Sequence, residues 1–314
     1  MQTIVIGSNG GVGAAIVDIL LANKQEVTGA TLSGKDKYSR GFSVMQFNAL
    51  FAAEYEKLPK AEIIFGAFNA SKYTAAVWEL EFNQFIDNFI AYGKSTKTRL
   101  VFIDNLYSYK LSSEHPISET SEVSPSAVLG KIRQAVAAKF LTAAKAGEIN
   151  GIIIRGSDLY GPYSLNTTVG ERFFSKLYKE NTCELLPIAN EPHMYTYTSD
   201  FADCAVFCAL DSKVNSGEVI IAPASEPVAF KNLINKIVSL SGQNPKWSKL
   251  PKFILQIGSI FDPMLKSVSS MGYEWESPFL VDYSKYKKIN PDFKVTSLDK
   301  GLAQTVAWFK LKVK

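Results

Sequence analysis

Residues 3–13 read TIVIGSNGGVG, in which an apolar strand runs straight into a glycine-rich turn and the start of a helix. Glycines let the backbone turn sharply and approach a ligand closely, and the free N–H groups at a helix start attract an anion. Val12, Ile16 and Leu20 recur at helical spacing, so the helix is expected to pack one face on a sheet. This order of elements predicts a site for the pyrophosphate of a dinucleotide rather than a turn that binds nothing. The residues expected at that site are Gly7, Ser8, Asn9, Gly10, Gly11, Val12 and Gly13.

Apolar runs and helical patterns alternate through the first half of the chain. Strands are expected over 26–31, 43–47, 62–65, 100–103 and 151–155, and amphipathic helices over 76–92 and 126–146. Such alternation is typical of parallel strands joined by crossover helices, so we predict an α/β fold with a doubly wound parallel sheet of the Rossmann type.

The second half is less regular and richer in Pro, Tyr and Trp, which favours a smaller C-terminal substrate lid. Residues 1–158 are expected to form the dinucleotide-binding core and 159–314 mostly the lid. Within the lid, 199–222 and 297–314 are expected to pack back on the core. An independent second domain is the less favoured alternative.

Composition limits the function classes. The chain of 314 residues has 34 basic and 30 acidic residues, a net charge of +4, and no dense block of Lys or Arg, so neither nucleic acid nor a membrane is an expected partner. It begins in a core strand and has no apolar stretch of spanning length, so we expect no signal peptide and a cytoplasmic location. With three cysteines and two histidines, no metal site is expected, and Cys204 and Cys208 have the spacing of core residues on one helix.

The end of the second expected strand bears on which dinucleotide binds. NAD sites commonly place an Asp or Glu there, whereas a basic residue suits the 2′-phosphate of NADP. Residues 31–33 contain no acid, and Ser33, Lys35 and Arg40 could receive a phosphate, so NADP is favoured and NAD is the alternative. Asn48 and Phe68, which follow the third and fourth strands, complete the expected cofactor contacts, although Asn48 also suits a turn.

The three-residue spacing of Gly7, Gly10 and Gly13 is similar to that of the short-chain dehydrogenase/reductase superfamily, especially its extended branch of epimerases and dehydratases. Later stretches resemble an atypical, NAD-dependent epimerase/dehydratase-like group. They are DNLYSY (104–109), RGSDLYGP (155–162), HMYTYTSDFA (193–202), YEW (273–275), PFLVD (278–282) and TVAW (305–308). The resemblance spans nearly the whole chain. It implies an NAD(P)-dependent oxidoreductase or epimerase that acts on a small carbonyl, hydroxyl or nucleotide-sugar substrate.

The chain departs from that superfamily at its usual catalytic pair. Typical members carry a Tyr and, four residues later, a Lys at the start of the long helix, where the Lys charge helps the Tyr to ionise. Alignment around Gly130 and Arg133 places Pro125 at the Tyr position and Leu129 at the Lys position, and neither can ionise. A Tyr-x-x-x-Lys spacing at 283–287 lies too far downstream and is read as coincidence.

Other residues are better located for chemistry. The resemblance places Asn105 at the usual Ser/Thr position, and Tyr107 and Tyr109 lie on the loop after the strand 100–103, where α/β sheets present ligand groups. These three are the catalytic candidates, with Tyr107 as acid or hydrogen-bond donor; the alternative is that the tyrosines only line the pocket.

The loop after the strand 151–155 supplies the substrate candidates. Asp158 and Tyr160 lie in that loop, and His193 comes later; Asp158 could orient a sugar hydroxyl or cap its own turn, and His193 could titrate near neutral pH or be structural. Arg155 is expected to anchor the loop through backbone carbonyls.

Two functions remain open. One is an enzyme in which Asn105, Tyr107 and a bound water replace the missing pair, and the cofactor supplies the hydride chemistry. The other is a dinucleotide-binding sensor or interaction protein without turnover, which the loss of both Tyr and Lys favours. The resemblance also implies a possible homodimer through the helices 76–92 and 126–146.

Overall fold

A computed structural model describes residues 1–112, 115–185, 190–249 and 271–313, so that 186–189 and 250–270 of the expected lid lie outside the described residues. Its main sheet has seven parallel strands in the order β11-β6-β5-β4-β1-β2-β3. The strands are β1 (Gln2–Ile6), β2 (Glu26–Thr31), β3 (Ser43–Gln46), β4 (Ile63–Gly66), β5 (Arg99–Asn105), β6 (Asn150–Gly156) and β11 (Val219–Ile221). The order reverses at β1, which is the doubly wound topology that the alternation predicted.

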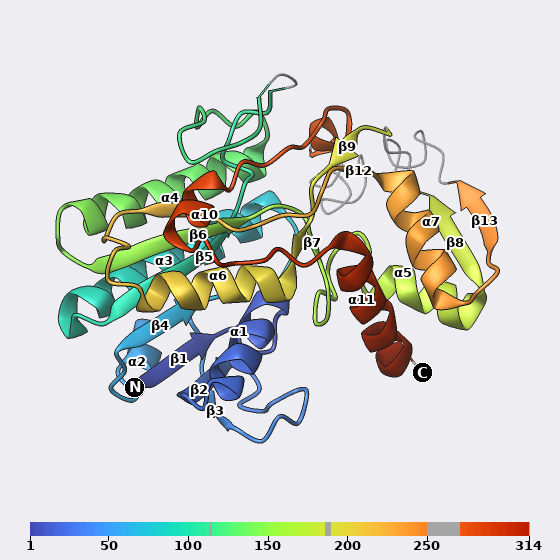
Figure 1. Cartoon of the computed structure of the whole chain (residues 1–314). Helices are drawn as coiled ribbons and strands as arrows, with labels where there is room; N and C mark the ends of the chain where they lie inside the picture. Colours follow the sequence, from blue (N-terminus) through green and yellow to red (C-terminus); the bar gives the residue numbers. More distant parts are fainter. Residues whose placement is uncertain (113–114, 186–189, 250–270, 314) are drawn as a thin grey trace.

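Helices cover both faces of this sheet (Figure 1). One face carries α1 (Gly11–Ala22) and α6 (Thr198–Leu210), and the other carries α3 (Ala75–Thr96) and α4 (Val128–Lys145). Alternate residues of one strand pack against the two helix layers, because successive side chains point to opposite faces of the sheet. In β1, Ile4 and Ile6 join the α3–α4 layer, whereas Val5 joins the α1–α6 layer. A strand buried on both faces is therefore expected to be continuously apolar, as residues 4–6 are.

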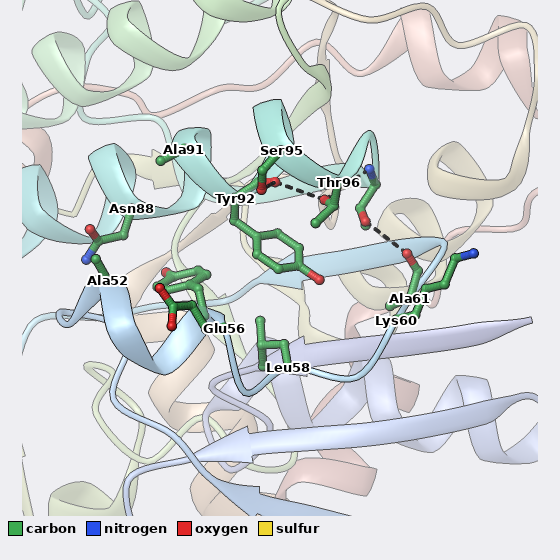
Figure 2. Close-up of a pocket in the computed structure, with 12 residues that line it drawn as sticks. Ala52, Glu56, Leu58, Lys60, Ala61, Asn88, Ala91, Tyr92, Ser95 and Thr96 are labelled. Atoms are coloured by element: carbon green, nitrogen blue, oxygen red, sulfur yellow. Dashed lines mark hydrogen bonds between the residues drawn. The ribbon is translucent and has the colours of Figure 1, made fainter.

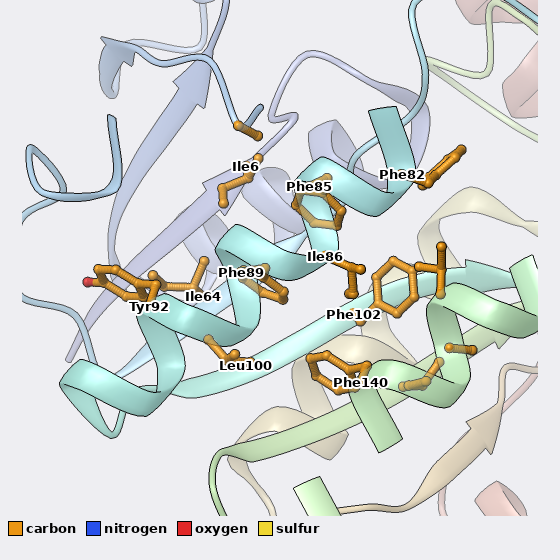
Figure 3. Packing of buried hydrophobic residues seen from close by; sticks show 14 of the residues in the cluster. Ile6, Ile64, Phe82, Phe85, Ile86, Phe89, Tyr92, Leu100, Phe102 and Phe140 are labelled. Carbon is orange, nitrogen blue, oxygen red and sulfur yellow. The ribbon is translucent and has the colours of Figure 1, made fainter. Parts of the chain in front are cut away.

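Aromatic residues fill the layer between α3, α4 and the sheet (Figure 3). Phe85 and Phe89 of α3, Phe102 of β5 and Phe140 of α4 are all fully buried and pack ring against ring. Burying each such ring contributes about 1.5–3 kcal/mol. This layer holds the start of α4 and the end of β5 in a fixed relation, which matters for the site below.

Much of the second half of the chain forms a second hydrophobic cluster beside the sheet. It is built from α5 (Glu171–Ser175), the π-helical turn Lys176–Glu180, β8 (Thr182–Leu185), α7 (Phe230–Ser241), β13 (Lys246–Lys249) and α11 (Leu298–Val313) (Figure 1). Short ribbons join it to the sheet: β7 (Leu159–Tyr160) with β10 (Thr196–Tyr197), and β9 (Pro192–His193) with β12 (Val228–Ala229). The remaining short helices are α2 (Ala52–Tyr55), the 3-10 helix η2 (Gly272–Trp275) and α10 (Ser284–Ile289).

The two returning segments behave differently. Segment 199–222 supplies α6, which packs on α1, and β11, which extends the sheet. Segment 297–314 supplies α11, whose buried face lies against α5 and α7, and Trp308 of α11 contacts Tyr38. Within the described ranges, no helix is long and apolar enough to cross a membrane.

Candidate functional site

The glycine-rich turn after β1 has room for glycine alone at two positions. Gly7 has φ = 79°, and a Cβ there would lie 2.3 Å from the carbonyl oxygen of Ala67. A Cβ on Gly13 would lie 2.3 Å from the carbonyl oxygen of Gly7. Helix α1 therefore begins hard against the end of β1, and its first-turn N–H groups, which have no acceptor within a helix, lie at the carboxyl edge of the sheet. This is a cradle of the kind that fits a dinucleotide pyrophosphate.

The polar residues of the turn act mainly on the chain itself. Ser8 is fully buried, with its hydroxyl beside Gly29 of β2 and its carbonyl oxygen accepting from Arg40. Asn9 donates from Nδ2 to the carbonyl oxygen of Lys35 (2.8 Å) and accepts from the N–H of Lys37 (3.0 Å). Asn9 thus positions the loop after β2, where the adenosine ribose is expected.

Arg40 is engaged within the protein, contrary to its expected phosphate role. Its guanidinium pairs with Asp36 at 2.8 Å and donates to the carbonyl oxygens of Ser8 and Ala14, each at 3.0 Å. Burial acts to raise the pKa of Asp36, but the hydrogen bonds from Arg40 outweigh burial and the pKa is lowered. Ser33 and Lys35 remain exposed near this loop.

The two outer cofactor candidates follow β3 and β4. Asn48 accepts from the N–H of Leu50 at 3.1 Å, which is the turn role that its sequence position also suited. Phe68 is half-buried and stacks on Phe85 of α3, with ring centroids 4.6 Å apart. Both therefore lie at the same carboxyl edge as the glycine turn, as parallel strands require.

Asn105 ends β5, and Tyr107 follows it in a tight turn. The N–H of Tyr107 donates to Oδ1 of Asn105 at 3.1 Å, so the amide nitrogen of Asn105 is the group left to donate. The Tyr107 hydroxyl lies 3.5 Å from that of Tyr73, and its ring is parallel to that of Trp78 with centroids 6.3 Å apart. We call Tyr73, Trp78 and Tyr107 the aromatic wall. Burial raises the pKa of Tyr107 well above its ordinary value and that of Tyr73 to about 12, so both hydroxyls stay protonated at neutral pH.

The start of α4 approaches Tyr107 closely. A Cβ on Gly130 would lie 2.3 Å from the carbonyl oxygen of Tyr107 and 2.6 Å from Cβ of Pro125. Leu129, beside it, is fully buried. Apolar side chains therefore occupy the two positions to which the sequence resemblance assigns the usual Tyr and Lys.

Behind Asn105 lies a buried group of three charges, which we call the Asp104 triad: Asp104, Arg133 of α4 and Arg155 of β6. Nε of Arg155 donates to Asp104 at 3.0 Å, and Arg133 lies 3.3 Å from the other carboxylate oxygen. Burial lowers the pKa of Arg133. Burial acts in the same direction on Arg155, but the charges and hydrogen bonds of Asp104 and Tyr109 together outweigh it and raise the pKa. The expectation that Arg155 is anchored by backbone carbonyls is wrong, since its partner is this carboxylate. Tyr109 lies under the same group, with the Arg155 guanidinium 4.8 Å from its ring centre, and is 2 % exposed.

A second group of ionisable side chains comes from three distant parts of the chain, and we call it the carboxyl cluster: Asp158, His193 and Glu274. Nδ1 of His193 lies 3.7 Å from Oδ2 of Asp158. The imidazole is stacked between the rings of Trp275 (4.9 Å) and Phe279 (5.6 Å). Glu274 is 3 % exposed, and burial together with the Asp158 charge raises its pKa well above its ordinary value. The charges of Asp158 and Glu274 also act on Tyr73 and Tyr107, so this cluster faces the aromatic wall.

Tyr160 is not brought to this group. Its ring is fully buried in the second hydrophobic cluster against Tyr197, and its hydroxyl lies where a Cβ on Gly301 of α11 would be only 2.5 Å away. Tyr160 therefore lies beneath α11, whereas Asp158, two residues earlier, lies beside His193. The N–H of Thr196 donates to the carbonyl oxygen of Asp158 at 2.9 Å, where β10 pairs in parallel with β7.

Sequence reasoning missed Tyr73, Trp78 and Glu274. Glu274 lies within the YEW stretch, but nothing in its spacing marks it as buried, and Asp158, whose charge acts on it, lies more than one hundred positions earlier in the chain. Asp104 lies in the DNLYSY stretch, and Arg133 lies in the stretch on which the start of the long helix was aligned. Their opposite charges beside apolar runs are the signal in the sequence from which this ion pair could have been predicted.

A separate pocket of about 470 Å³ lies between α2 and α3 (Figure 2). Ala61 and Thr98, at the amino ends of β4 and β5, line it. It is therefore at the opposite sheet edge from the glycine turn and takes no part in the site. Among the described residues, no group of three or more His, Cys, Asp or Glu could hold a metal ion.

Solved structures with this fold include nucleotide-sugar enzymes. A UDP-glucuronic acid 4-epimerase from Bacillus cereus with UDP-glucuronic acid and NAD gives a TM-score of 0.81 at 16 % identity, covering 99 % of this chain and 100 % of that one. A dTDP-glucose 4,6-dehydratase double mutant from Streptomyces venezuelae with NAD gives 0.81 at 15 % identity and covers 100 % of both chains. A UDP-galactose 4-epimerase gives 0.79 at 15 % identity and covers 99 % of both. At these identities the likeness shows the fold.

Sequence comparison gives the family. No curated protein matches the chain. The model of the NAD-dependent epimerase/dehydratase family matches residues 3–222, which hold the glycine turn, the Asp104 triad, Asn105, Tyr107 and two members of the carboxyl cluster. The predicted kinship with the extended short-chain dehydrogenases/reductases is confirmed, and this chain belongs to the NAD-dependent epimerase/dehydratase family.

Proposed function

We propose that this chain is a nicotinamide-dinucleotide-dependent oxidoreductase or epimerase/dehydratase-type enzyme that acts on a hydroxyl or carbonyl group of a small or nucleotide-sugar substrate. The observation that carries the proposal is spatial. The start of α1, the end of β5 and the loop after β6 share one edge of the sheet, so a dinucleotide held by the first would meet polar groups on the other two.

The glycine turn would hold the pyrophosphate through the N–H groups of Gly11 and Val12. The adenosine half would extend along the ends of β2, β3 and β4, toward Ser33 and Lys35 and between Asn48 and Phe68. The exposed side chains of Ser33 and Lys35 favour NADP, whereas two of the solved structures described above contain NAD. Dissociation constants for NADH and NADPH, measured by calorimetry, decide between the two.

When bound, the nicotinamide supplies hydride acceptance and donation. The chain's own part is to orient the substrate oxygen. The free amide nitrogen of Asn105 and the protonated hydroxyl of Tyr107 are hydrogen-bond donors at the end of β5, and a high pKa keeps Tyr107 a donor rather than a base. The aromatic wall excludes water beside them.

Pro125 and Leu129 cannot replace the usual ionisable pair, so the proton must come from elsewhere in the site, either from water or from another residue. The same loss favours the second candidate function, a dinucleotide-binding sensor without turnover. Incubation with NADH or NADPH and a panel of carbonyl compounds and nucleotide sugars separates the two. Consumption of the reduced cofactor supports the enzyme, whereas tight binding without consumption supports the sensor.

We also propose a homodimer through α3 and α4. Their outer faces expose Leu80 (59 %) and Val128 (45 %), which are large apolar side chains. Light scattering at micromolar concentration is expected to give twice the mass of one chain, and a monomer would remove the proposal.

A further inference from the structure

Tyr73 and Tyr107 reach the same crevice from two adjacent strands. Strands β4 and β5 pair in parallel, Tyr73 ends the loop after β4, and Tyr107 lies two residues past β5. The order of strands reverses between β1 and β4, so the chain leaves β1 for α1 on one face and β4 for α3 on the other. Ligands of such sheets bind in the crevice that opens at this reversal, and both tyrosines are half-buried beside it.

The two hydroxyl groups, which we call the hydroxyl pair, form a hydrogen bond with a direction. The Tyr73 hydroxyl donates to the Tyr107 oxygen at 3.5 Å. Since the Tyr107 oxygen accepts this bond, its own proton points away from Tyr73 and can be donated to a substrate oxygen. Tyr107 is held for this role, because its N–H donates to Asn105 at 3.1 Å and the close approach of Gly130 limits the movement of its carbonyl group.

Ring packing, and not the hydroxyl pair, fixes the two side chains. Trp78, which is 2 % exposed, meets the Tyr73 ring edge to face with centroids 5.1 Å apart and lies parallel to the Tyr107 ring at 6.3 Å. The Arg133 guanidinium lies 5.0 Å from the Trp78 ring centre and holds that ring in turn. A change from Tyr to Phe at either position therefore removes a hydroxyl and leaves the aromatic wall packed.

The electrostatic surroundings make Tyr73 the place where the pair loses a proton. Burial raises the pKa of Tyr73 to about 12, although the hydrogen bond with Tyr107 and the Arg133 charge lower it. Burial also raises the pKa of Tyr107, and there the hydrogen bond with Tyr73 acts in the same direction as burial. The charges of Glu274 and Asp158 raise the pKa of both hydroxyls.

We propose that Tyr73 supplies Tyr107 with a proton, and that the hydroxyl pair delivers it to the carbonyl oxygen of the substrate in place of the missing Tyr–Lys pair. This inference rests on the proposed function and names the proton source that it leaves open. Tyr107 is the catalytic residue, because it touches the substrate oxygen. Tyr73 is a positioning residue that acts through Tyr107.

The step balances in the direction of carbonyl reduction. Hydride from the reduced nicotinamide dinucleotide forms the new C–H bond, the π pair of the C=O bond moves to oxygen, and this oxygen takes the proton of Tyr107. The Tyr107 oxygen takes the proton of Tyr73, which is left as a phenolate until it takes a proton from solvent. Both hydroxyls are protonated at neutral pH, so the pair is ready to give a proton and is better suited to reducing a carbonyl than to oxidising an alcohol.

The hydrogen bond can be tested without cofactor or substrate. With 3-chlorotyrosine in place of Tyr73, the halogen makes the phenol more acidic, and its ionisation can be followed by absorbance. Its pKa is expected to be higher by about half a pH unit or more when Tyr107→Phe removes the partner. Tyr92→Phe is the matched control, because Tyr92 is also on α3 but lines the separate pocket at the opposite sheet edge. An unchanged pKa in Tyr107→Phe overturns the pair.

Turnover of a reactive carbonyl compound then tests the transfer. Tyr107→Phe is expected to lower kcat by about 10²–10⁴-fold. Tyr73→Phe is expected to lower it by about 10- to 100-fold, the value of a hydrogen bond to a charged oxygen, with KM nearly unchanged. Because the two hydroxyls act in series, the double variant should be no slower than Tyr107→Phe alone. Tyr92→Phe should keep the wild-type kcat.

The number of protons in motion separates a relay from a purely structural role of Tyr73. In single-turnover measurements in mixtures of H₂O and D₂O, the wild-type rate should fall along a curve as the deuterium fraction rises, because two protons move. The rate of Tyr73→Phe should fall along a straight line. A straight line for the wild type, or a wild-type kcat in Tyr73→Phe, shows that the relay is wrong while the enzyme interpretation stands. If the wild type consumes no cofactor with any carbonyl compound, both are wrong.

Discussion

Replacing Asp104 by Asn is expected to destabilise the protein severely, because it leaves two buried guanidinium groups without their counter-ion. Asp104 is fully buried at its side chain and lies 3.0 Å from Arg155 and 3.3 Å from Arg133. The triad carries one net positive charge, and the substitution raises this to two. Asn also presents an amide N–H₂ group to groups that are themselves donors, so the hydrogen bond from Arg155 is weakened as well.

The size of the effect follows from comparison with an exposed pair of the same length. Lys110 and Glu122 are also 3.0 Å apart, with 61 % of each side chain exposed. At 3.0 Å the gross attraction is about 5.5 kcal/mol at an effective dielectric constant of 20, against about 1.4 kcal/mol in bulk water. Removing one partner of a buried pair costs about 3–5 kcal/mol, whereas an exposed pair contributes about 0.2–1 kcal/mol. Asp104→Asn should therefore cost about 3 kcal/mol or more, and Glu122→Gln less than about 1 kcal/mol.

Urea denaturation followed by circular dichroism measures the unfolding free energy of both variants, and the melting temperature of Asp104→Asn should be lower by about 5 °C or more. A double variant sharpens the test. Asp104→Asn with Arg155→Met restores the net charge of the triad to +1, so it should be more stable than Asp104→Asn alone although it has lost a further native contact. If the double variant is the less stable of the two, or if Asp104→Asn and Glu122→Gln cost the same, burial of charge is not what the triad controls.

Three further changes test the site. Gly13→Ala places a Cβ 2.3 Å from the Gly7 carbonyl oxygen and should abolish cofactor binding in calorimetry, whereas unchanged binding would refute the close approach of α1. Gly130→Ala places a Cβ 2.3 Å from the Tyr107 carbonyl oxygen, so it should displace that turn, cost about 1–3 kcal/mol and lower turnover more than cofactor affinity; equal losses in both would argue against it. Lys35→Glu should weaken NADPH binding and leave NADH binding nearly unchanged, and a parallel loss of both would show that Lys35 does not contact a 2′-phosphate.

The fold was predictable from sequence because its signals are local. The strand 26–31 and the helices near 76–92 and 126–146 were predicted within a few residues of β2, α3 and α4, since apolar periodicity and glycine punctuation act over short distances. The direction of α11 was less predictable, because its apolar face suits any apolar surface, and here the nearest one belongs to α5 and α7.

The candidate site was predictable from the sequence only in part. The glycine turn and Asn105 could be predicted because they stand at strand ends, and local sequence motifs mark those positions. The pairing of Arg155 with Asp104 and the burial of Tyr160 depend on packing between distant parts of the chain, and so do the hydrogen bonds from Arg40 to the carbonyl oxygens of Ser8 and Ala14. Judged by residue type alone, each of these side chains could bind a ligand. Only the contacts in the folded protein show whether it is already engaged by other residues.

The parallel stacking of Trp275 on His193 makes tryptophan fluorescence a probe of this part of the site. Indole emission is quenched by a neighbouring imidazole to an extent that depends on contact and on protonation, so anything that parts the two rings or changes the charge between them alters the fluorescence. With four tryptophans in the chain, substitution of the other three by Phe would leave an intrinsic optical probe at the contact between His193 and the C-terminal segment.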